Sequence, residues 1–371
     1  MGARGLAISI HPHANDSAYT HRVVKLAGCL EQRGIPCDMF NMPDNPPLDT
    51  QTTSGIFMPF WMRLLRKYDF FYCGGDAAAQ AMFLCKPFLR GPVIFDVHGD
   101  EPAQDMLFKQ VMRPGREPSV SLRVKLFHFL AVHAADHLLT VSRLQIDPFV
   151  RSGIHRERIS IIRNGVDLDL FPPLPFQDRP EFTFCYVGEF QHWQNIDNLI
   201  AAFERLNNPA ARMLVVGFRE SDQQIKQAFA EKFGERVTLI DRVSREALPE
   251  LVQKVAVLVI PRSDHPAIRH AFPTKFAEYA AWARPIMVNN VDETAEFVTR
   301  YDCGFVSDPS PEAMAATMEE ASRTSVERLS HMGRQARRAA EENFSWDTIG
   351  DEYAEVIRKL TGKAGSSTAS Q

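Results

Sequence analysis

The sequence lacks several features that would place the protein in a specialised class. Its six cysteines form no Cys-x-x-Cys pair and mostly lie inside apolar stretches, so we expect reduced core cysteines and no zinc site. No apolar run approaches the ~20 residues that a membrane-spanning helix needs. The first ten residues do not have the layout of a signal peptide. We therefore expect the chain to stay in the cytoplasm.

The chain also lacks a strong excess of charge. Its net charge is −4 over 371 residues, and hydrophobic residues make up 45%, a balance typical of soluble globular proteins. Residues 1–168 contain 19 Lys and Arg against 16 Asp and Glu, whereas the remainder contains 23 against 30. The acidic second half is unsuited to nucleic acid, so we expect no nucleic-acid partner. The mildly basic first half is compatible with an anionic surface.

Short apolar runs alternate with amphipathic stretches along the chain, which predicts parallel sheets covered by helices. The pattern restarts after a proline-rich break at residues 171–180. We predict an α/β protein with two doubly wound domains, 1–168 and 169–345, that face a central cleft. We expect helix 346–361 to pack back on the first domain and the tail 362–371 to be disordered. The predicted strands are residues 6–10, 37–40, 70–73, 93–97, 137–141, 159–162, 182–187, 212–216, 237–240, 255–260, 285–288 and 304–306.

The most informative stretch lies between two predicted strands of the second domain, where Phe272, Pro273 and Thr274 lead into a helix. The free N–H groups and positive dipole end of such a helix can hold a diphosphate, and Lys275 adds a full positive charge. Glu278 lies about one turn further along the same face, so its carboxylate can accept hydrogen bonds from a ribose diol. A solvated Lys–Glu pair on a surface helix is the alternative for such a pair in isolation. The strand–loop–helix context favours a nucleotide site.

Four segments of the sequence follow one another in a specific order and spacing. They are residues 163–167 (RNGVD) with Phe171, residues 186–202, residues 273–285 and residues 344–346 (FSW). With these segments the chain resembles the retaining glycosyltransferases of family 4, in which similar motifs occur at the domain junction, at the start of the donor domain, around the acidic residue that holds the ribose and at the entry to the final helix. By this resemblance Glu278 corresponds to the acidic residue. More loosely, residues 136–142 are similar to a further motif of that family.

The resemblance implies the GT-B fold, with two Rossmann-like domains, and transfer of a sugar from a nucleoside-diphosphate sugar to an acceptor hydroxyl. It further implies retention of anomeric configuration, no metal or other cofactor, and a saccharide or lipid-linked saccharide acceptor in cell-surface polysaccharide or glycolipid assembly. The residues that we expect to bind the donor are Gly188, Gln194, Arg262, Phe272, Pro273, Thr274, Lys275 and Glu278.

The chain departs from the family pattern at positions that matter for the donor. Glu189 and Gln194 stand where members commonly have an Arg and a Lys on the diphosphate, His270 replaces an acidic residue, and Ala283 replaces a glycine. We expect Glu189 to point away from the diphosphate or to bond elsewhere. The departures leave a second hypothesis, a catalytically inactive homologue that binds a nucleotide sugar or a partner protein. The nearby cations that can replace the missing pair are Lys275, Arg262 and Arg269.

In the first domain, candidate residues follow two predicted strands. His13 and Asn15 lie in a loop without glycine and are candidate acceptor-side contacts, or else residues that cap a helix or face solvent. His98 resembles the histidine of a His-Gly turn that contacts the donor sugar in related enzymes, with a structural role as the alternative. Asp100 and Glu101 form a closely spaced carboxylate pair, and Asp100 joins His98 as a candidate catalytic residue.

Two stretches, residues 57–68 and 106–126, combine apolar and basic side chains. One interpretation is ordinary amphipathic helices packed on a sheet. The other is peripheral contact with an anionic membrane surface, to which each nearby Lys or Arg adds attraction.

Overall fold

The computed structural model describes residues 2–9, 18–41, 66–112, 119–176 and 181–363. The chain divides into an N-terminal unit, Met1–Asn164 with Trp346–Gln371, and a C-terminal unit, Gly165–Ser345. The division falls at residue 164, close to the boundary that we placed after residue 168. From residue 364 onward, the tail for which we expect disorder lies outside the described residues.

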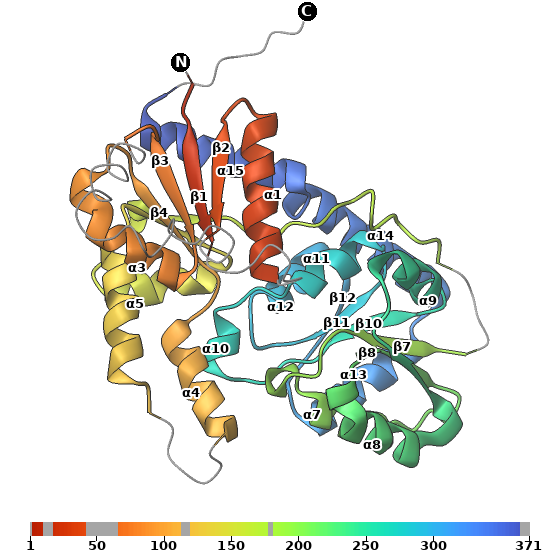
Figure 1. The fold of residues 1–371 in the computed structure, drawn as a ribbon. Helices are drawn as coiled ribbons and strands as arrows, with labels where there is room; N and C mark the ends of the chain where they lie inside the picture. Colours follow the sequence, from red (N-terminus) through yellow and green to blue (C-terminus); the bar gives the residue numbers. More distant parts are fainter. Residues whose placement is uncertain (1, 10–17, 42–65, 113–118, 177–180, 364–371) are drawn as a thin grey trace, which may run out of the picture. The chain divides into compact units, whose positions relative to one another are not determined.

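The sheet of the N-terminal unit has six described strands, all parallel, in the order β2-β1-β3-β4-β5-β6 (Figure 1). The chain builds outward from β1 to β2 on one side and then from β3 to β6 on the other. The strand order therefore reverses between β1 and β3. The strands are β1 (Gly5–Ser9), β2 (Cys37–Asn41), β3 (Phe70–Gly74), β4 (Val93–Val97), β5 (His137–Thr140) and β6 (Ile159–Ile161).

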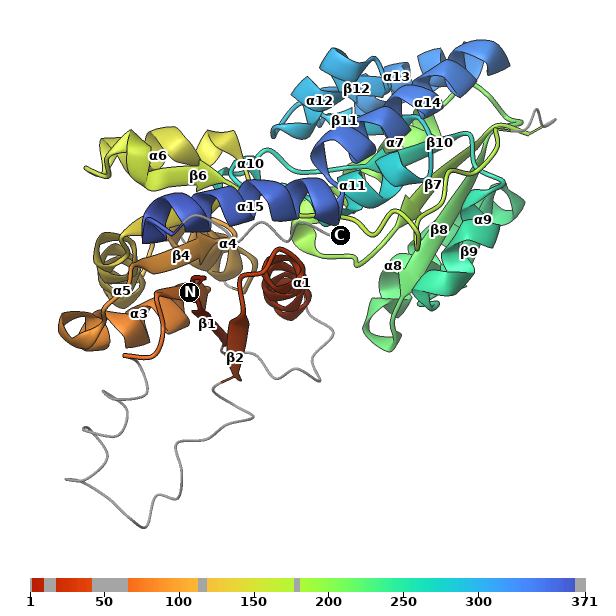
Figure 2. The same ribbon diagram turned by 90° about the horizontal axis from the view of Figure 1, so that it is seen from above.

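Helices cover both faces of this sheet. Along β3, Phe71 and Cys73 pack in the core beneath α3 and α5, whereas Phe70 and Tyr72 pack against α1 and α15. Because successive side chains of a strand point to opposite faces, a strand covered on both sides is mostly apolar, as β3 is throughout and β4 is except for Asp96. Figures 1 and 2 show α15 beside α1. The helices are α1 (Ala18–Gln32), α3 (Asp76–Cys85), α4 (Glu101–Met112), α5 (Leu122–Ala134), α6 (Ile146–Arg151) and α15 (Trp346–Thr361).

The described sheet of the C-terminal unit also has six parallel strands, in the order β12-β11-β10-β7-β8-β9. Here the strand order reverses between β7 and β10, because β8 and β9 add to one side of β7 and the later strands add to the other. The strands are β7 (Thr183–Val187), β8 (Arg212–Phe218), β9 (Val237–Asp241), β10 (Val257–Ile260), β11 (Ile286–Asn289) and β12 (Gly304–Ser307).

Two layers of side chains enclose this second sheet. One core contains inward residues of the strands together with Leu199 and Phe203 of α7 and Met314 and Met318 of α13. On the other face α11 packs beside α14 (Figures 1 and 2). The helices are α7 (Ile196–Arg205), α8 (Gln223–Phe233), α9 (Leu248–Val252), α10 (Pro266–Arg269), α11 (Thr274–Ala281), α12 (Thr294–Tyr301), α13 (Pro311–Arg323) and α14 (Val326–Asn343).

The predicted strands match the observed ones to within a few residues, and the predicted fold class of two Rossmann-like units is confirmed. All six cysteines are unpaired, and all but Cys85 are buried, as we expected. In the described part of the chain, no helix is long and apolar enough to cross a bilayer. Nor do the described residues include a group of three or more His, Cys, Asp or Glu side chains arranged to hold a metal ion.

Ala283 ends α11 in a backbone conformation that favours glycine. Its φ is +57°, in the left-handed region, directly after the C-cap residue Trp282. A Cβ in this conformation is strained by roughly 1–2 kcal/mol, and helices therefore commonly end in glycine at this position. The family that the sequence resembles has glycine here.

Replacing Ala283 with glycine should therefore stabilise the protein. Relief of the strain outweighs the greater chain entropy of glycine, so we expect Ala283→Gly to raise the free energy of unfolding by about 0.5–1 kcal/mol. Urea denaturation measures the change. Ala280→Gly, inside the same helix, is the control and should destabilise by at least ~1 kcal/mol. Equal losses in the two variants would contradict the strain at Ala283.

Candidate functional site

The candidate site of the C-terminal unit lies at the carboxyl edge of its sheet, between β7 and β10, where the strand order reverses. Doubly wound sheets bind ligands outside this edge at such a switch point. Gly188 directly follows β7 with a φ of +141°, and Gly217 in β8 has a φ of +121°. A Cβ on Gly217 would lie 2.5 Å from the carbonyl oxygen of Gly188. Glycine is thus required for the two strand ends to approach this closely.

Lys275 of α11 lies against this glycine turn. A Cβ on Gly188 would lie 2.3 Å from Cε and 2.4 Å from Nζ of Lys275, so the space beside Gly188 is filled by the lysine side chain. The Lys275 Nζ donates a hydrogen bond to the Tyr186 hydroxyl at 2.9 Å and lies 4.4 Å from the centre of the Tyr186 ring. The amine is therefore held by an aromatic face and a phenol rather than by a carboxylate.

The environment of Lys275 disfavours its charged form. Burial and the nearby Arg262 lower the pKa of Lys275 to about 7, although Glu278 and Glu189 act in the opposite direction. The amine thus changes charge near neutral pH. An anion placed beside it would favour the protonated form and would gain a charge-assisted hydrogen bond.

Glu278 lies one turn after Lys275 on α11, as the sequence predicts. Its side chain is 24% exposed, and its Oε1 lies 3.9 Å from Nη2 of Arg245, which follows β9 at the same edge of the sheet. Burial raises the pKa of Glu278, and Arg245 and Lys275 oppose that rise. The carboxylate is sheltered but reachable, which suits a group that binds a ligand hydroxyl.

The position of α11 is fixed from both sides. The Tyr279 hydroxyl donates to the carbonyl oxygen of Val187 at 3.0 Å and accepts from the Val187 N–H at 2.9 Å, which ties the helix to the end of β7. The buried Phe272 packs against Phe276 and Phe344, with ring centres 5.7 and 5.3 Å apart. Phe272 is therefore a core residue that anchors the loop, while Thr274 is exposed at the start of the helix.

Glu189 stands where the family commonly has an Arg, and the structure places another Arg, Arg219, beside it, which our sequence reasoning missed. The Glu189 carboxylate forms an ion pair with Nη2 of Arg219, so it bonds elsewhere, as we expected. Arg219 follows β8 directly, two residues after Gly217, and therefore lies at the same carboxyl edge. The sequence does show a basic residue shortly after a predicted strand, which could have indicated Arg219. Only the pairing of β7 with β8 places Arg219 beside Glu189.

Arg262 and Arg269, the other cations that we expected to replace the missing Arg and Lys, are each paired with an acidic side chain. Arg262 is 6% exposed, and its Nε lies 3.0 Å from Oδ2 of the buried Asp292. Arg269 forms hydrogen bonds of 2.7 and 3.0 Å with Asp264. Gln194 ends a single 3-10 turn, residues His192–Gln194, at this edge. Arg262 therefore contributes its electric field to the site, through the pKa of Lys275.

In the N-terminal unit, His98 follows β4 and is oriented by a buried charge network. Its Nε2 lies 3.0 Å from Oδ2 of Asp96, a carboxylate that is fully buried. Arg22 of α1 forms a bidentate pair with Asp96 at 2.8 and 3.0 Å, and the Tyr72 hydroxyl donates to the same carboxylate at 2.5 Å. Burial alone would raise the pKa of Asp96, but Arg22 and His98 hold it well below its usual range.

Asp100 has a clear local role. Its Oδ1 accepts a hydrogen bond from the N–H of Ala103 at 3.0 Å, at the start of α4, which is the geometry of a helix cap. The neighbouring candidates cannot be placed in the same way, because His13 and Asn15 lie outside the described residues.

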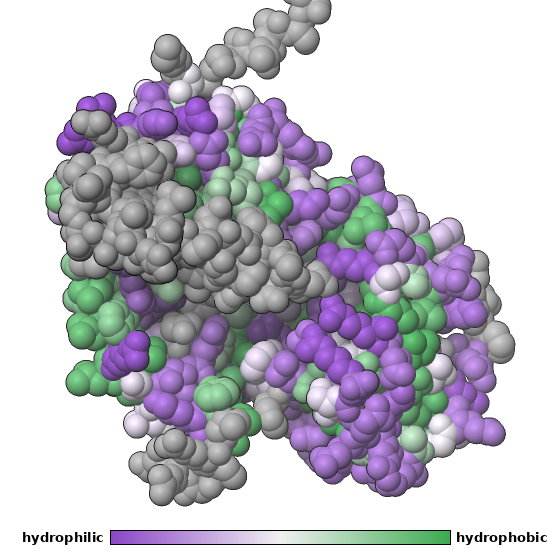
Figure 3. All heavy atoms as spheres, in the orientation of Figure 1, coloured by the Kyte–Doolittle hydropathy of each residue, from purple (hydrophilic) through white to green (hydrophobic). Residues whose placement is uncertain are grey.

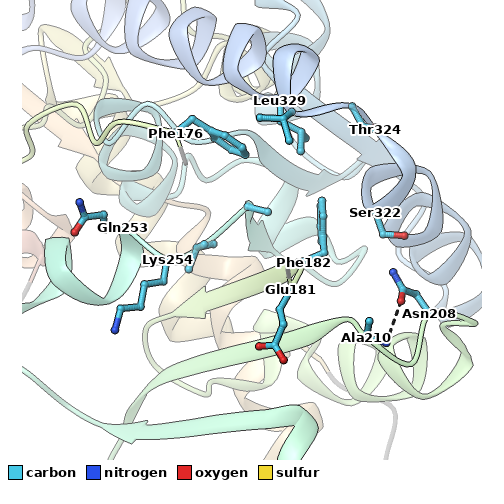
Figure 4. Close-up of a pocket in the computed structure, with 13 residues that line it drawn as sticks. Phe176, Glu181, Phe182, Asn208, Ala210, Gln253, Lys254, Ser322, Thr324 and Leu329 are labelled. Atoms are coloured by element: carbon cyan, nitrogen blue, oxygen red, sulfur yellow. Dashed lines mark hydrogen bonds between the residues drawn. The ribbon is translucent and has the colours of Figure 1, made fainter. Parts of the chain in front are cut away.

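A cavity of about 270 Å³ lies elsewhere in the C-terminal unit (Figure 4). The cavity is lined by Phe182, Ala210 and Ala256, each of which lies one or two residues before a strand: β7, β8 and β10, respectively. The cavity is therefore at the amino edge of the sheet. The cavity is thus at the opposite end of the strands from Lys275 and Glu278.

Comparison with known proteins identifies the family. The profile described as glycosyl transferases group 1 matches residues 173–339, and that of glycosyltransferase family 4 matches residues 20–170. The chain belongs to glycosyltransferase family 4. A D-inositol 3-phosphate glycosyltransferase of Mycobacteroides abscessus is 26% identical over 281 residues, which are 70% of this chain. The chain spans 61% of the length of that curated relative.

Solved structures show the fold of this family 4 protein. Sucrose-phosphate synthase from Thermosynechococcus elongatus has a TM-score of 0.75 at 18% identity, over 97% of this chain and 99% of its own. The HepE protein of Anabaena, solved with UDP-glucose, has a TM-score of 0.69 at 17% identity, over 96% of this chain and 100% of its own. At these identities the likeness establishes the GT-B fold with two Rossmann-like domains.

The contact between Gly188 and Lys275 in this family 4 protein makes a testable prediction. Gly188→Ala should cost roughly 1–3 kcal/mol of stability through backbone strain, and its Cβ should displace the flexible end of the Lys275 side chain. Displacement should return the pKa of Lys275 towards that of an ordinary lysine, from about 7. Urea denaturation and NMR titration of Lys275 labelled at ¹³Cε measure the two effects.

Gly153→Ala is the matched control for this experiment. Gly153 also has a positive φ, +95°, but a Cβ there would meet nothing within 4 Å. This variant should show the strain and leave the titration of Lys275 unchanged. A Gly188→Ala protein in which Lys275 still titrates near pH 7 would show that the glycine does not position the lysine.

Proposed function

We propose that the protein transfers a sugar from a nucleoside-diphosphate sugar to an acceptor hydroxyl, with retention of anomeric configuration. The observation on which this rests most is the arrangement at the switch point of the C-terminal sheet. There the glycine turn, the N-terminus of α11, Lys275 and Glu278 occupy one edge, over the length of one helical turn.

The diphosphate is assigned to Lys275 and the N-terminus of α11. Pro273 is extended directly before the helix, so the first N–H groups of α11 have no intrahelical acceptor and offer a partial positive charge. Bond cleavage leaves negative charge on the departing diphosphate, and fixed donors at that position stabilise it. Arg219 is the second cation in this proposal, because a diphosphate can compete with Glu189 for its guanidinium.

Glu278 is assigned to the ribose of the donor nucleotide. Its half-buried carboxylate lies one turn from Lys275, which matches the step from phosphate to ribose in a nucleotide. Gly188 and Gln194 are proposed to border the nucleotide at the same edge. Since side chains and a helix end neutralise the diphosphate in this scheme, the reaction requires no metal ion or other cofactor.

In the N-terminal unit, we assign a catalytic role to His98. It follows β4, and the buried pair of Arg22 and Asp96 fixes the orientation of its ring. Asp100 caps α4 beside it, which leaves Asp100 a supporting role rather than that of a catalytic base. The acceptor is proposed to be a saccharide or lipid-linked saccharide used in cell-surface polysaccharide or glycolipid assembly. The names of the curated relatives, which are inositol phosphate glycosyltransferases, support a hydroxyl acceptor.

One observation favours a second candidate function. Glu189 and Gln194 leave the site with fewer cations than the family pattern provides, so an inactive homologue that binds a nucleotide sugar is the competing proposal. It predicts binding of the nucleotide sugar without turnover.

A panel of UDP-, GDP- and ADP-sugars, followed by mass spectrometry, tests the proposal. We expect one donor class to turn over in the presence of EDTA, with NMR of the product showing the donor's anomeric configuration. Glu278→Ala should weaken nucleotide binding by about tenfold or more, since each charge-assisted bond contributes roughly 1.5–3 kcal/mol. His98→Ala should lower kcat about tenfold, or ~1.4 kcal/mol, with nucleotide affinity unchanged.

Glu235→Ala, an exposed carboxylate of the same unit, is the control and should leave both properties unchanged. Binding of a nucleotide sugar with no turnover under any acceptor condition would favour the inactive homologue. Absence of binding to every member of the panel would contradict both proposals.

The charges around Lys275 give a second prediction, on phosphate binding. Lys275→Ala and Arg219→Gln should each weaken UDP about tenfold more than they weaken uridine, because only UDP has the diphosphate. Glu189→Gln should instead strengthen UDP, since it releases Arg219 and removes a negative charge. Arg269→Gln, whose partner is Asp264, is the control. Equal losses for UDP and uridine would make Lys275 a structural residue.

The same amine should make donor binding depend on pH. Below pH 7 Lys275 is already protonated, whereas above it binding must first add a proton, so affinity for UDP-glucose should fall as the pH rises from 6 to 8. UDP-glucose is the suitable probe because its diphosphate diester does not titrate in this range. Calorimetry measures the affinity, and Lys275→Ala should abolish the dependence. A flat profile in the wild type would contradict the proposed contact.

A further inference from the structure

Helices α4 and α5 of the N-terminal unit expose an unusual amount of apolar surface. Leu122 is 81% exposed, Phe108 is 64% exposed, and Leu126 and Phe129 are each more than half exposed. Large apolar side chains exposed singly are ordinary, but neighbouring ones on two packed helices form a patch of the kind that marks a binding surface. We call Phe108, Leu122, Leu126, Phe127 and Phe129 the α4–α5 surface.

Helix α5 is rich in apolar residues and has no distinct polar face, because Arg123, Lys125 and its two histidines are spread around it. Apolar side chains of a helix in a globular unit normally face the core. Here only its last part is buried, through Ala131, Val132 and Ala134 against the core of the unit, while its first two turns face outward. Packing within the described unit therefore does not explain the apolar residues at its start.

The patch continues on the neighbouring elements. α3 packs beside α5, and Phe83 of α3 and Phe88 of the following 3-10 turn (Lys86–Phe88) are 40% and 36% exposed. Figure 3 shows hydrophobic surface gathered over the α3 and α5 side of this unit.

The charged side chains of α5, the helix that contributes most of the α4–α5 surface, are all basic. Helix α5 contains Arg123 and Lys125 and no Asp or Glu, and the guanidinium of Arg123 lies 5.5 Å from the Phe127 ring centre. The nearby carboxylates have basic partners: Asp105 pairs with Lys109 at 2.7 Å, and Asp76 pairs with His128 at 2.7 Å.

We propose that the α4–α5 surface binds an anionic lipid bilayer. Its apolar side chains enter the boundary between headgroups and acyl chains, and Arg123 and Lys125 contact anionic headgroups while their stems lie along the apolar layer. This inference goes beyond the proposed function and does not depend on donor binding. Most of the second basic and apolar stretch, residues 57–65 of 57–68, lies outside the described residues. The proposal does not use that stretch.

The charge of the surface favours a bilayer over a second copy of the chain. A two-fold contact between copies through this surface would enclose Arg123 and Lys125 of both copies in one interface, with no acidic side chain of α5 to pair with them. That repulsion destabilises a dimer, whereas an anionic bilayer gains attraction of about fivefold in binding for each basic residue.

Vesicle flotation of the full chain tests the proposal. The wild type should float with phosphatidylcholine vesicles that contain phosphatidylglycerol, and much less with phosphatidylcholine alone or at high salt. Leu122→Ser with Leu126→Ser should reduce binding more than tenfold at low salt, because two leucines are lost from the apolar layer. Arg123→Gln with Lys125→Gln should reduce it by about tenfold or more and weaken its dependence on salt.

Matched controls separate this surface from exposed residues in general. Val24→Ser replaces an apolar residue of α1 that is 41% exposed, and Arg323→Gln replaces an exposed Arg of the C-terminal unit. Both should bind vesicles like the wild type. The variants of the α4–α5 surface should also bind UDP-glucose like the wild type, so that loss of vesicle binding is distinguished from failure of the donor site.

A fluorescence measurement distinguishes insertion from other occupants. Leu122→Trp should show a blue shift and quenching by lipids brominated on their acyl chains, whereas Val24→Trp should show neither. Absence of wild-type vesicle binding, or binding unaffected by Leu122→Ser with Leu126→Ser, would overturn the proposal. Light scattering without vesicles provides a further test. If Leu122→Ser with Leu126→Ser changed the oligomeric mass, the surface would belong to a contact between two copies of the chain, and the proposal would be overturned.

Discussion

The contact of Lys275 with the backbone of Gly188 is the constraint on which the candidate donor edge depends. It favours a glycine at the end of β7, because a side chain there would strain a backbone φ of +141° and its Cβ would displace the end of the lysine side chain. It also requires α11 to begin at the correct height, which Tyr279 secures through both backbone groups of Val187. The aromatic packing of Phe272 fixes the loop that leads into the helix. Tyr279 and Phe272, which are outside the set proposed to bind the ligand, therefore hold α11 and the loop before it in place.

The charges of this edge are arranged differently from the family pattern. Glu189 is paired with Arg219, and Arg262 is paired with Asp292, so Lys275 lies among charged neighbours without a carboxylate on its amine. A lysine in that situation loses its proton more easily, because burial and a nearby cation both disfavour the charge. Near pH 7 the amine is only partly protonated, so an anion bound beside it would increase its charge and couple proton uptake to ligand binding.

The N-terminal unit contains a buried ion pair, between Arg22 and Asp96, that connects several of its elements. Arg22 also donates to the carbonyl oxygens of Ile162 and Arg163 at 2.7 Å, so the pair with Asp96 joins α1, β4 and the segment after β6. A buried ion pair adds little net stability, but its removal leaves an uncompensated charge, which makes the arrangement specific. His98 is attached to this fixed point, and its ring is oriented by the core of the unit rather than by the surface loop that contains it.

The sequence by itself determined the alternation of strands and helices, the two-unit fold and the positions of Lys275 and Glu278 on one helix face. These follow from hydrophobic periodicity and from spacing along a single helix, which are local properties. Sequence reasoning placed Arg262 among the ligand-binding cations, whereas tertiary structure buries it against Asp292, and it missed Arg219 and Arg245 altogether. It also left open whether residues 106–126 pack on a sheet, and the structure leaves Phe108, Leu122 and Leu126 exposed. Only tertiary structure decided these points, because strand order brings together residues far apart in the chain, and burial and ion pairing depend on those neighbours.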